Sequence, residues 1–144
     1  MTTTQKAKKT DGFSAEERAA MKERAKELKA QARGADGEAA VREAIAEMPQ
    51  PDRDLATRFH ELVHEVAPAL VPRTWYGMPA YAKDGKVVVF FKSGPKYKER
   101  YATVGFNDPA QLDEGSMWPT SFALTDWNVQ NERRLRKLLT QSLG

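Results

Sequence analysis

The spacing of apolar residues changes at Pro72, and this change restricts the chain to helices followed by strands. The apolar residues at helical spacing before it are Leu55, Phe59, Leu62, Val63, Val66 and Leu70. After it, residues 87–91 (Val-Val-Val-Phe-Phe) are apolar at every position, which is typical of a strand covered on both faces. Asp84-Gly85 just before them favours a two-residue hairpin turn. We therefore predict an α+β fold, with a mostly antiparallel sheet of about four to five strands packed against helices.

Three segments are expected along the chain. Residues 1–13 lack apolar periodicity and are predicted to be a flexible tail. Residues 14–34 are predicted to be an N-terminal helical extension, because Ser14 followed by Glu17 forms a capping box. Residues 35–144 are predicted to be the α+β domain. Its further strands are expected at residues 101–106 and 122–125, and its last helix at residues 129–143.

Charge and composition exclude several classes of protein. The chain has no Cys, which excludes disulfides and thiolate metal sites. No apolar run approaches the roughly 18 residues of a membrane span, so we expect a cytoplasmic protein without membrane association. Residues 1–34 carry nine Lys and Arg against five Asp and Glu, whereas the remainder carries fourteen against fifteen. The basic excess therefore belongs to the N-terminal segment.

Residues 60–64 read His-Glu-Leu-Val-His, the H-E-x-x-H pattern in which zinc peptidases hold a metal between two histidines. At about 100° per residue, His60, Glu61 and His64 lie away from the apolar stripe, so we expect all three to face solvent. The chain has no third His, and no Glu occurs between Glu65 and Glu99 to act as a ligand from a following helix. We therefore interpret the pattern as a chance match and predict no metal site, no cofactor and no enzyme.

Aromatic residues are dense between residues 75 and 122, and they are interpreted chiefly as core. Some of them are also candidates for a ligand groove beside a turn expected at Gly77-Met78-Pro79. The candidate ligand-binding residues are Trp75, Tyr76, Met78, Tyr81 and Trp118.

A second candidate surface combines basic and aromatic side chains. Its residues are Lys96, Lys98, Arg100 and Tyr101. Basic groups hold phosphates and aromatic rings stack on bases, so this segment is a candidate contact for an anion or for single-stranded nucleic acid. The other interpretation is a charged surface loop whose lysines protect an edge strand.

Four stretches of the chain resemble the YdhG-like family of small bacterial domains of unknown function. They are the string Trp-Tyr-Gly-Met-Pro-Ala-Tyr at residues 75–81, the predicted strand at 87–91, and residues 101–106 and 117–124. The resemblance implies an antiparallel sheet packed on helices for residues 35–144. Some members are described as frataxin-like intracellular iron chaperones, so it also implies weak iron binding by surface carboxylates. Acidic residues are scattered in this chain, and we assign no iron ligand from the resemblance.

These observations predict a non-enzymatic domain that binds a small ligand or a protein partner, as a monomer or small oligomer. An iron-chaperone-like role is implied by the resemblance alone. The alternative is an accessory nucleic-acid-binding protein that uses its basic tail and the loop from Lys96 to Arg100.

Overall fold

The computed structural model describes residues 14–32 and 37–144. The chain divides into two compact units, Met1–Ala35 and Asp36–Gly144. The first unit contains helix α2 (Ala15–Ala32), which begins with the predicted capping box. The backbone N–H of Glu17 donates to Ser14 Oγ at 3.0 Å, and that of Ser14 donates to Glu17 Oε1 at 2.9 Å. The tail predicted at residues 1–13 lies outside the described residues, as does the predicted end of the extension at residue 34.

The second unit contains three α-helices and five strands, with one short 3₁₀ helix between β3 and β4. The elements are α3 (Gly37–Ala46), α4 (Asp52–Val66), β1 (Val71–Trp75), β2 (Met78–Lys83), β3 (Lys86–Lys92), η1 (Pro95–Tyr97), β4 (Ala102–Phe106), β5 (Ser121–Leu124) and α5 (Val129–Ser142). This order of helices, strands and a closing helix confirms the predicted α+β fold. Among the described residues, no helix has both the length and the apolar character that crossing a membrane requires.

The five strands form one antiparallel sheet in the order β1-β2-β3-β4-β5. The predicted hairpin at Asp84-Gly85 is confirmed, and both residues have positive φ, 52° and 78°. The turn expected at residues 77–79 is wrong by position, because β1 and β2 are joined by Tyr76 and Gly77, with φ of 52° and 80°. The two residues of this turn both need positive φ, which proline cannot adopt. Pro79 therefore lies after the turn, in the extended backbone of β2.

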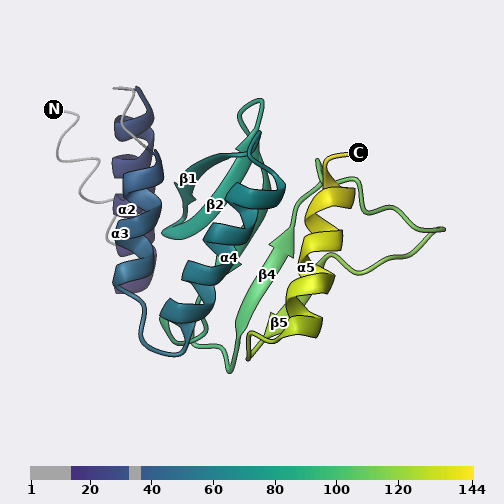
Figure 1. The fold of residues 1–144 in the computed structure, drawn as a ribbon. Coiled ribbons are helices and arrows are strands. Elements are labelled where there is room, and N and C mark those ends of the chain that lie inside the picture. Colours follow the sequence, from purple (N-terminus) through teal and green to yellow (C-terminus); the bar gives the residue numbers. More distant parts are fainter. Residues whose placement is uncertain (1–13, 33–36) are drawn as a thin grey trace, which may run out of the picture. The chain divides into compact units, whose positions relative to one another are not determined.

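The three helices of this unit pack on one side of the sheet (Figure 1). Helices α4 and α5 lie side by side, while α3 packs on β1 and β2 and against α4. The apolar stripe of α4 faces the sheet as predicted: the Phe59 ring centroid lies 5.9 Å from that of Tyr81 and 6.3 Å from that of Phe91. These residues form the centre of the hydrophobic core.

Two close contacts anchor the helices to the sheet. At the start of α3, a Cβ added to Gly37 would lie 2.0 Å from the carbonyl oxygen of Pro72 in β1. At the start of α4, the buried carboxylate of Asp52 accepts hydrogen bonds from Ser93 Oγ and from the backbone N–H of Gly94, both at 2.8 Å. The first contact determines where α3 begins over the sheet, and the second ties α4 to the loop after β3.

Candidate metal centre

The two histidines of the 60–64 motif lie on the flank of α4 that faces α3. The side chain of His64 is 45% exposed, whereas that of His60 is 5% exposed. The expectation that both imidazoles face solvent is therefore wrong for His60. The prediction from helical angles took only the apolar stripe of α4 as covered, by the sheet. In the structure α3 also covers the flank that carries His60.

A carboxylate from α3 meets both imidazoles. Glu38 Oε2 lies 2.8 Å from His60 Nε2, and Glu38 Oε1 lies 2.8 Å from His64 Nε2. The two Nε2 atoms are 3.2 Å apart. One donor atom from each of the three residues lies within 4.8 Å of the others. We call this set, Glu38, His60 and His64, the Glu–His–His cluster.

Local sequence explains how the Glu–His–His cluster is assembled. Four residues along a helix complete about one turn, so His60 and His64 project on the same side of α4. Glu38 follows Gly37, whose missing side chain lets the first turn of α3 approach the backbone of β1. The carboxylate of Glu38 can therefore reach the two histidines of α4 from the preceding helix.

Two of the three side chains have an outer partner that orients them. Tyr81 Oη lies 2.8 Å from His60 Nδ1, which turns the other ring nitrogen toward Glu38. Burial raises the pKa of the Tyr81 hydroxyl, and the charge of Glu38 raises it further, so this partner is neutral. Arg42 Nε donates to Glu38 Oε2 at 2.6 Å. Metal-binding histidines and carboxylates in proteins are commonly held by outer hydrogen bonds of this kind.

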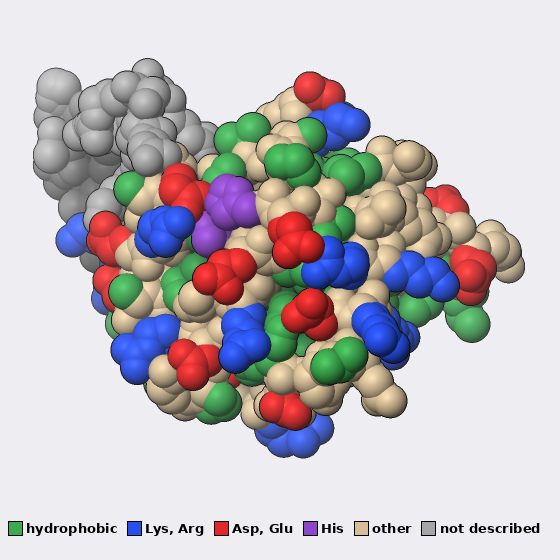
Figure 2. Space-filling view, in the orientation of Figure 1, with side chains coloured by type: hydrophobic (Ala, Val, Ile, Leu, Met, Phe, Trp, Pro, Cys, Tyr) green, Lys and Arg blue, Asp and Glu red, His purple; other side chains and the backbone are tan. Residues whose placement is uncertain are grey.

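The Glu–His–His cluster can bind a divalent metal ion. Two imidazoles and one carboxylate are the ligands of the His₂Glu class of zinc site. Metal–ligand bonds of about 2.0–2.1 Å in a tetrahedral arrangement separate the ligand atoms by about 3.3–3.4 Å. The observed separations of 2.8 and 3.2 Å require an outward movement of a few tenths of an ångström to about half an ångström. Figure 2 shows a patch of histidine at the molecular surface, with acidic and basic side chains beside it.

The carboxylate of Glu38 is ionised over a wide pH range. Burial raises its pKa, but hydrogen bonds from His60 and His64 and the positive charge of these rings outweigh burial and lower it from 4.5 to about 2. A lowered pKa in the folded state means that the ionised carboxylate contributes stability in full above pH 4.5 and loses it as the pH falls to about 2.

We therefore expect a pH-dependent difference in the free energy of unfolding between wild type and Glu38→Gln. The difference should shrink as the pH falls from 4.5 toward about 2, because only the wild type has this titrating carboxyl group. Urea unfolding followed by circular dichroism at a series of pH values measures it. A difference that does not change with pH would contradict the assigned hydrogen bonds.

The structure does not bring together all the aromatic residues predicted to bind a ligand. Trp75, Tyr76 and Met78 lie at the β1–β2 hairpin, where the Trp75 ring contacts Tyr76 with centroids 5.2 Å apart. Tyr81 is in the core, with its hydroxyl on His60. Trp118 precedes β5 and packs against the core near the opposite edge of the sheet from β1.

The basic segment predicted to contact anions packs back on the same hairpin. Tyr97 Oη donates to the backbone oxygen of Tyr76 at 2.8 Å, and Lys96 Nζ lies 3.4 Å from that of Gly77. The Arg100 guanidinium lies 5.2 Å from the ring centroid of Tyr101. Lys98 follows η1 with a positive φ of 60°. Lys96 and Tyr76 therefore both lie at the β1–β2 hairpin, although they belong to two different predicted sites.

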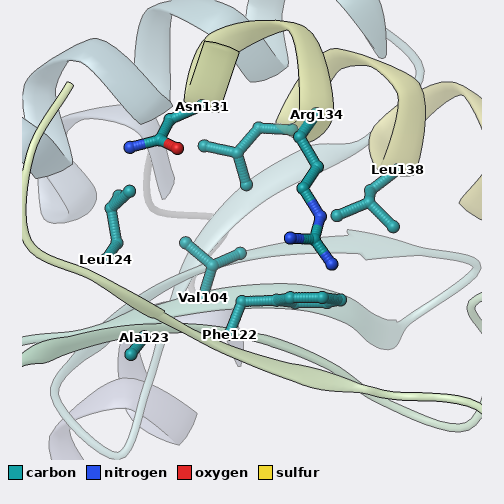
Figure 3. A pocket seen from close by; sticks show the side chains of 8 residues that line it. Val104, Phe122, Ala123, Leu124, Asn131, Arg134 and Leu138 are labelled. Carbon is teal, nitrogen blue, oxygen red and sulfur yellow. The ribbon is translucent and has the colours of Figure 1, made fainter. Parts of the chain in front are cut away.

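A separate groove lies between α5 and the edge of the sheet at β5. Its volume is about 240 Å³, and it is lined by Val104, Phe122, Ala123, Leu124, Asn131, Arg134, Leu135 and Leu138. Figure 3 shows Arg134 extending from α5 toward the sheet, with its guanidinium above the Phe122 ring, 5.2 Å from the ring centroid. The groove offers an apolar floor and one cation, but its lining contains none of the predicted ligand-binding residues.

Comparison of the chain with protein-family models, with curated proteins and with solved structures found no match. The resemblance to the YdhG-like family stays a prediction from the sequence.

Proposed function

We propose that this protein binds a divalent first-row transition-metal ion, represented by Zn²⁺, through Glu38, His60 and His64. The observation that carries the proposal is the convergence of one carboxylate and two imidazole Nε2 atoms from two helices. Two hydrogen bonds support it, one between Tyr81 and His60 and one from Arg42 to Glu38, because they orient the ligands before an ion arrives.

The proposal concerns binding and not hydrolysis. Glu61, which would activate water in a zinc peptidase, is exposed on α4 and does not belong to the Glu–His–His cluster. The iron-chaperone role implied by the family resemblance would use surface carboxylates, whereas this cluster offers two imidazoles and one carboxylate. Because Fe²⁺ stands near the weak end of the affinity order for nitrogen and oxygen ligands, we expect Zn²⁺ to displace it.

Isothermal titration of metal-free protein with Zn²⁺ tests the proposal. We expect one ion per chain for the wild type. Glu38→Gln and His64→Asn each remove one direct ligand, so each should lower the affinity by more than the roughly 10–100-fold that loss of an outer partner costs. Both positions are partly exposed, so these variants should remain folded.

Glu61→Gln is the matched control, because it changes the central glutamate of the motif and leaves all three proposed ligands in place. It should bind Zn²⁺ as the wild type does. A wild type that takes up no Zn²⁺ would overturn the proposal. So would a Glu38→Gln variant with unchanged affinity, because the two histidines would then bind metal as an ordinary surface pair.

A further inference from the structure

The cluster leaves at least one coordination position for a molecule from outside the chain. Three protein ligands fill three positions, and a zinc-like ion takes at least four. The side chains of His60, Glu38 and His64 are 5%, 26% and 45% exposed, so the cluster opens to solvent beside His64. An ion held there would carry an exchangeable water or another small ligand on that side.

A guanidinium lies beside the carboxylate of this cluster. Arg42 Nε donates to Glu38 Oε2 at 2.6 Å, and the Arg42 side chain is 68% exposed. This hydrogen bond uses one of the five N–H groups of the guanidinium, and the terminal nitrogens can still donate. A carboxylate has about four acceptor sites, so Glu38 can keep the contact with Arg42 while it binds a metal ion.

The charges of the loaded site favour an anion. A divalent ion with one carboxylate and two neutral imidazoles carries a net charge of +1, and Arg42 adds another positive charge beside the same carboxylate. Both centres prefer oxygen of an anion: the metal ion binds it directly, and the guanidinium matches the paired oxygens of carboxylate or phosphate.

We propose that the metal-loaded protein binds an oxyanion of the carboxylate or phosphate type, with one oxygen on the metal ion and a second oxygen on the Arg42 guanidinium. This inference rests on the proposed function. Arg42 then has two roles: its Nε donates to Glu38, and its terminal nitrogens donate to the anion. The metal ion and the planar guanidinium together favour an anion that has at least two oxygens.

Protein loaded with Co²⁺ tests the inference, because the visible absorption of Co²⁺ reports its ligands. Sodium phosphate and sodium acetate are titrated in separate experiments, with sodium perchlorate keeping the ionic strength constant. We expect each anion to change the wild-type spectrum to saturation. Arg42→Gln should require about tenfold more anion, which corresponds to about one charge-assisted hydrogen bond.

Arg133→Gln is the matched control, since Arg133 is an exposed arginine on α5 and should leave the titration unchanged. If Co²⁺ binds in a His64-dependent manner but neither anion changes the spectrum, the anion site is overturned and the metal site stands. If Arg42→Gln titrates as the wild type does, the role of Arg42 is overturned. A protein that takes up no Co²⁺ overturns the metal site and the anion site together.

Discussion

Replacement of Gly37 by Ala is expected to destabilise the folded protein by about 3 kcal/mol, as overpacking against rigid atoms does. The added Cβ would lie 2.0 Å from the carbonyl oxygen of Pro72 and 3.0 Å from its carbonyl carbon. These are backbone atoms of β1, so they cannot move aside as the end of a flexible side chain can. The first turn of α3 must shift instead.

The same shift should weaken metal binding, because Glu38 is the next residue. We expect Gly37→Ala to lower the Zn²⁺ affinity although it alters no ligand. Urea unfolding and Zn²⁺ titration of the same preparation measure the two effects. Within a helix Ala is intrinsically more favourable than Gly by about 1 kcal/mol, so the sign of the stability change is decisive. A more stable Gly37→Ala variant with unchanged Zn²⁺ affinity would refute the close approach of α3 to β1.

Replacement of Asp52 by Ala is expected to cost about 3 kcal/mol, because it leaves two buried donors without their charged acceptor. Asp52 Oδ2 accepts from both Ser93 Oγ and Gly94 N at 2.8 Å, and Asp52 and Ser93 are 6% and 1% exposed. Water has little access to replace these bonds. The free energy of unfolding from urea titration gives the size of the effect.

Asp52→Asn is the matched control. Its amide oxygen can occupy the position of Oδ2 and accept both hydrogen bonds, so we expect this variant to lose only about 1 kcal/mol. If Asp52→Ala and Asp52→Asn lose equal stability, the charge of Asp52 and not its two hydrogen bonds would be responsible. If neither variant loses stability, the hydrogen bonds between α4 and the loop after β3 contribute nothing to the free energy of unfolding.

Most of the fold can be predicted from patterns that neighbouring residues carry. The stripe on residues 55–70, the Asp84-Gly85 turn and the Ser14–Glu17 capping box each depend on residues close in sequence, and each is found in the structure. The turn before β2 lies at Tyr76 and Gly77 and not at the predicted residues 77–79. Tyr76 adopts positive φ there, which is uncommon for an aromatic residue.

The Glu–His–His cluster could not be predicted in the same way. The H-E-x-x-H pattern predicts a third ligand from a residue after the motif, whereas Glu38 lies on the helix before it. A helical projection gives the direction of His60 but not what covers it, and α3 and the hydroxyl of Tyr81 cover it here. The one available signal was Glu38 itself, an acidic residue in the first turn of α3.

The order of the strands has a consequence for how fast the chain folds. Each strand of the sheet pairs with the next one along the chain, and two of the hairpins close through two residues. Contacts between residues close in sequence need little loop closure, and folding rates rise as mean sequence separation falls. We therefore expect fast refolding for a sheet of five strands, with the packing of α5 on α4 as the longer-range step.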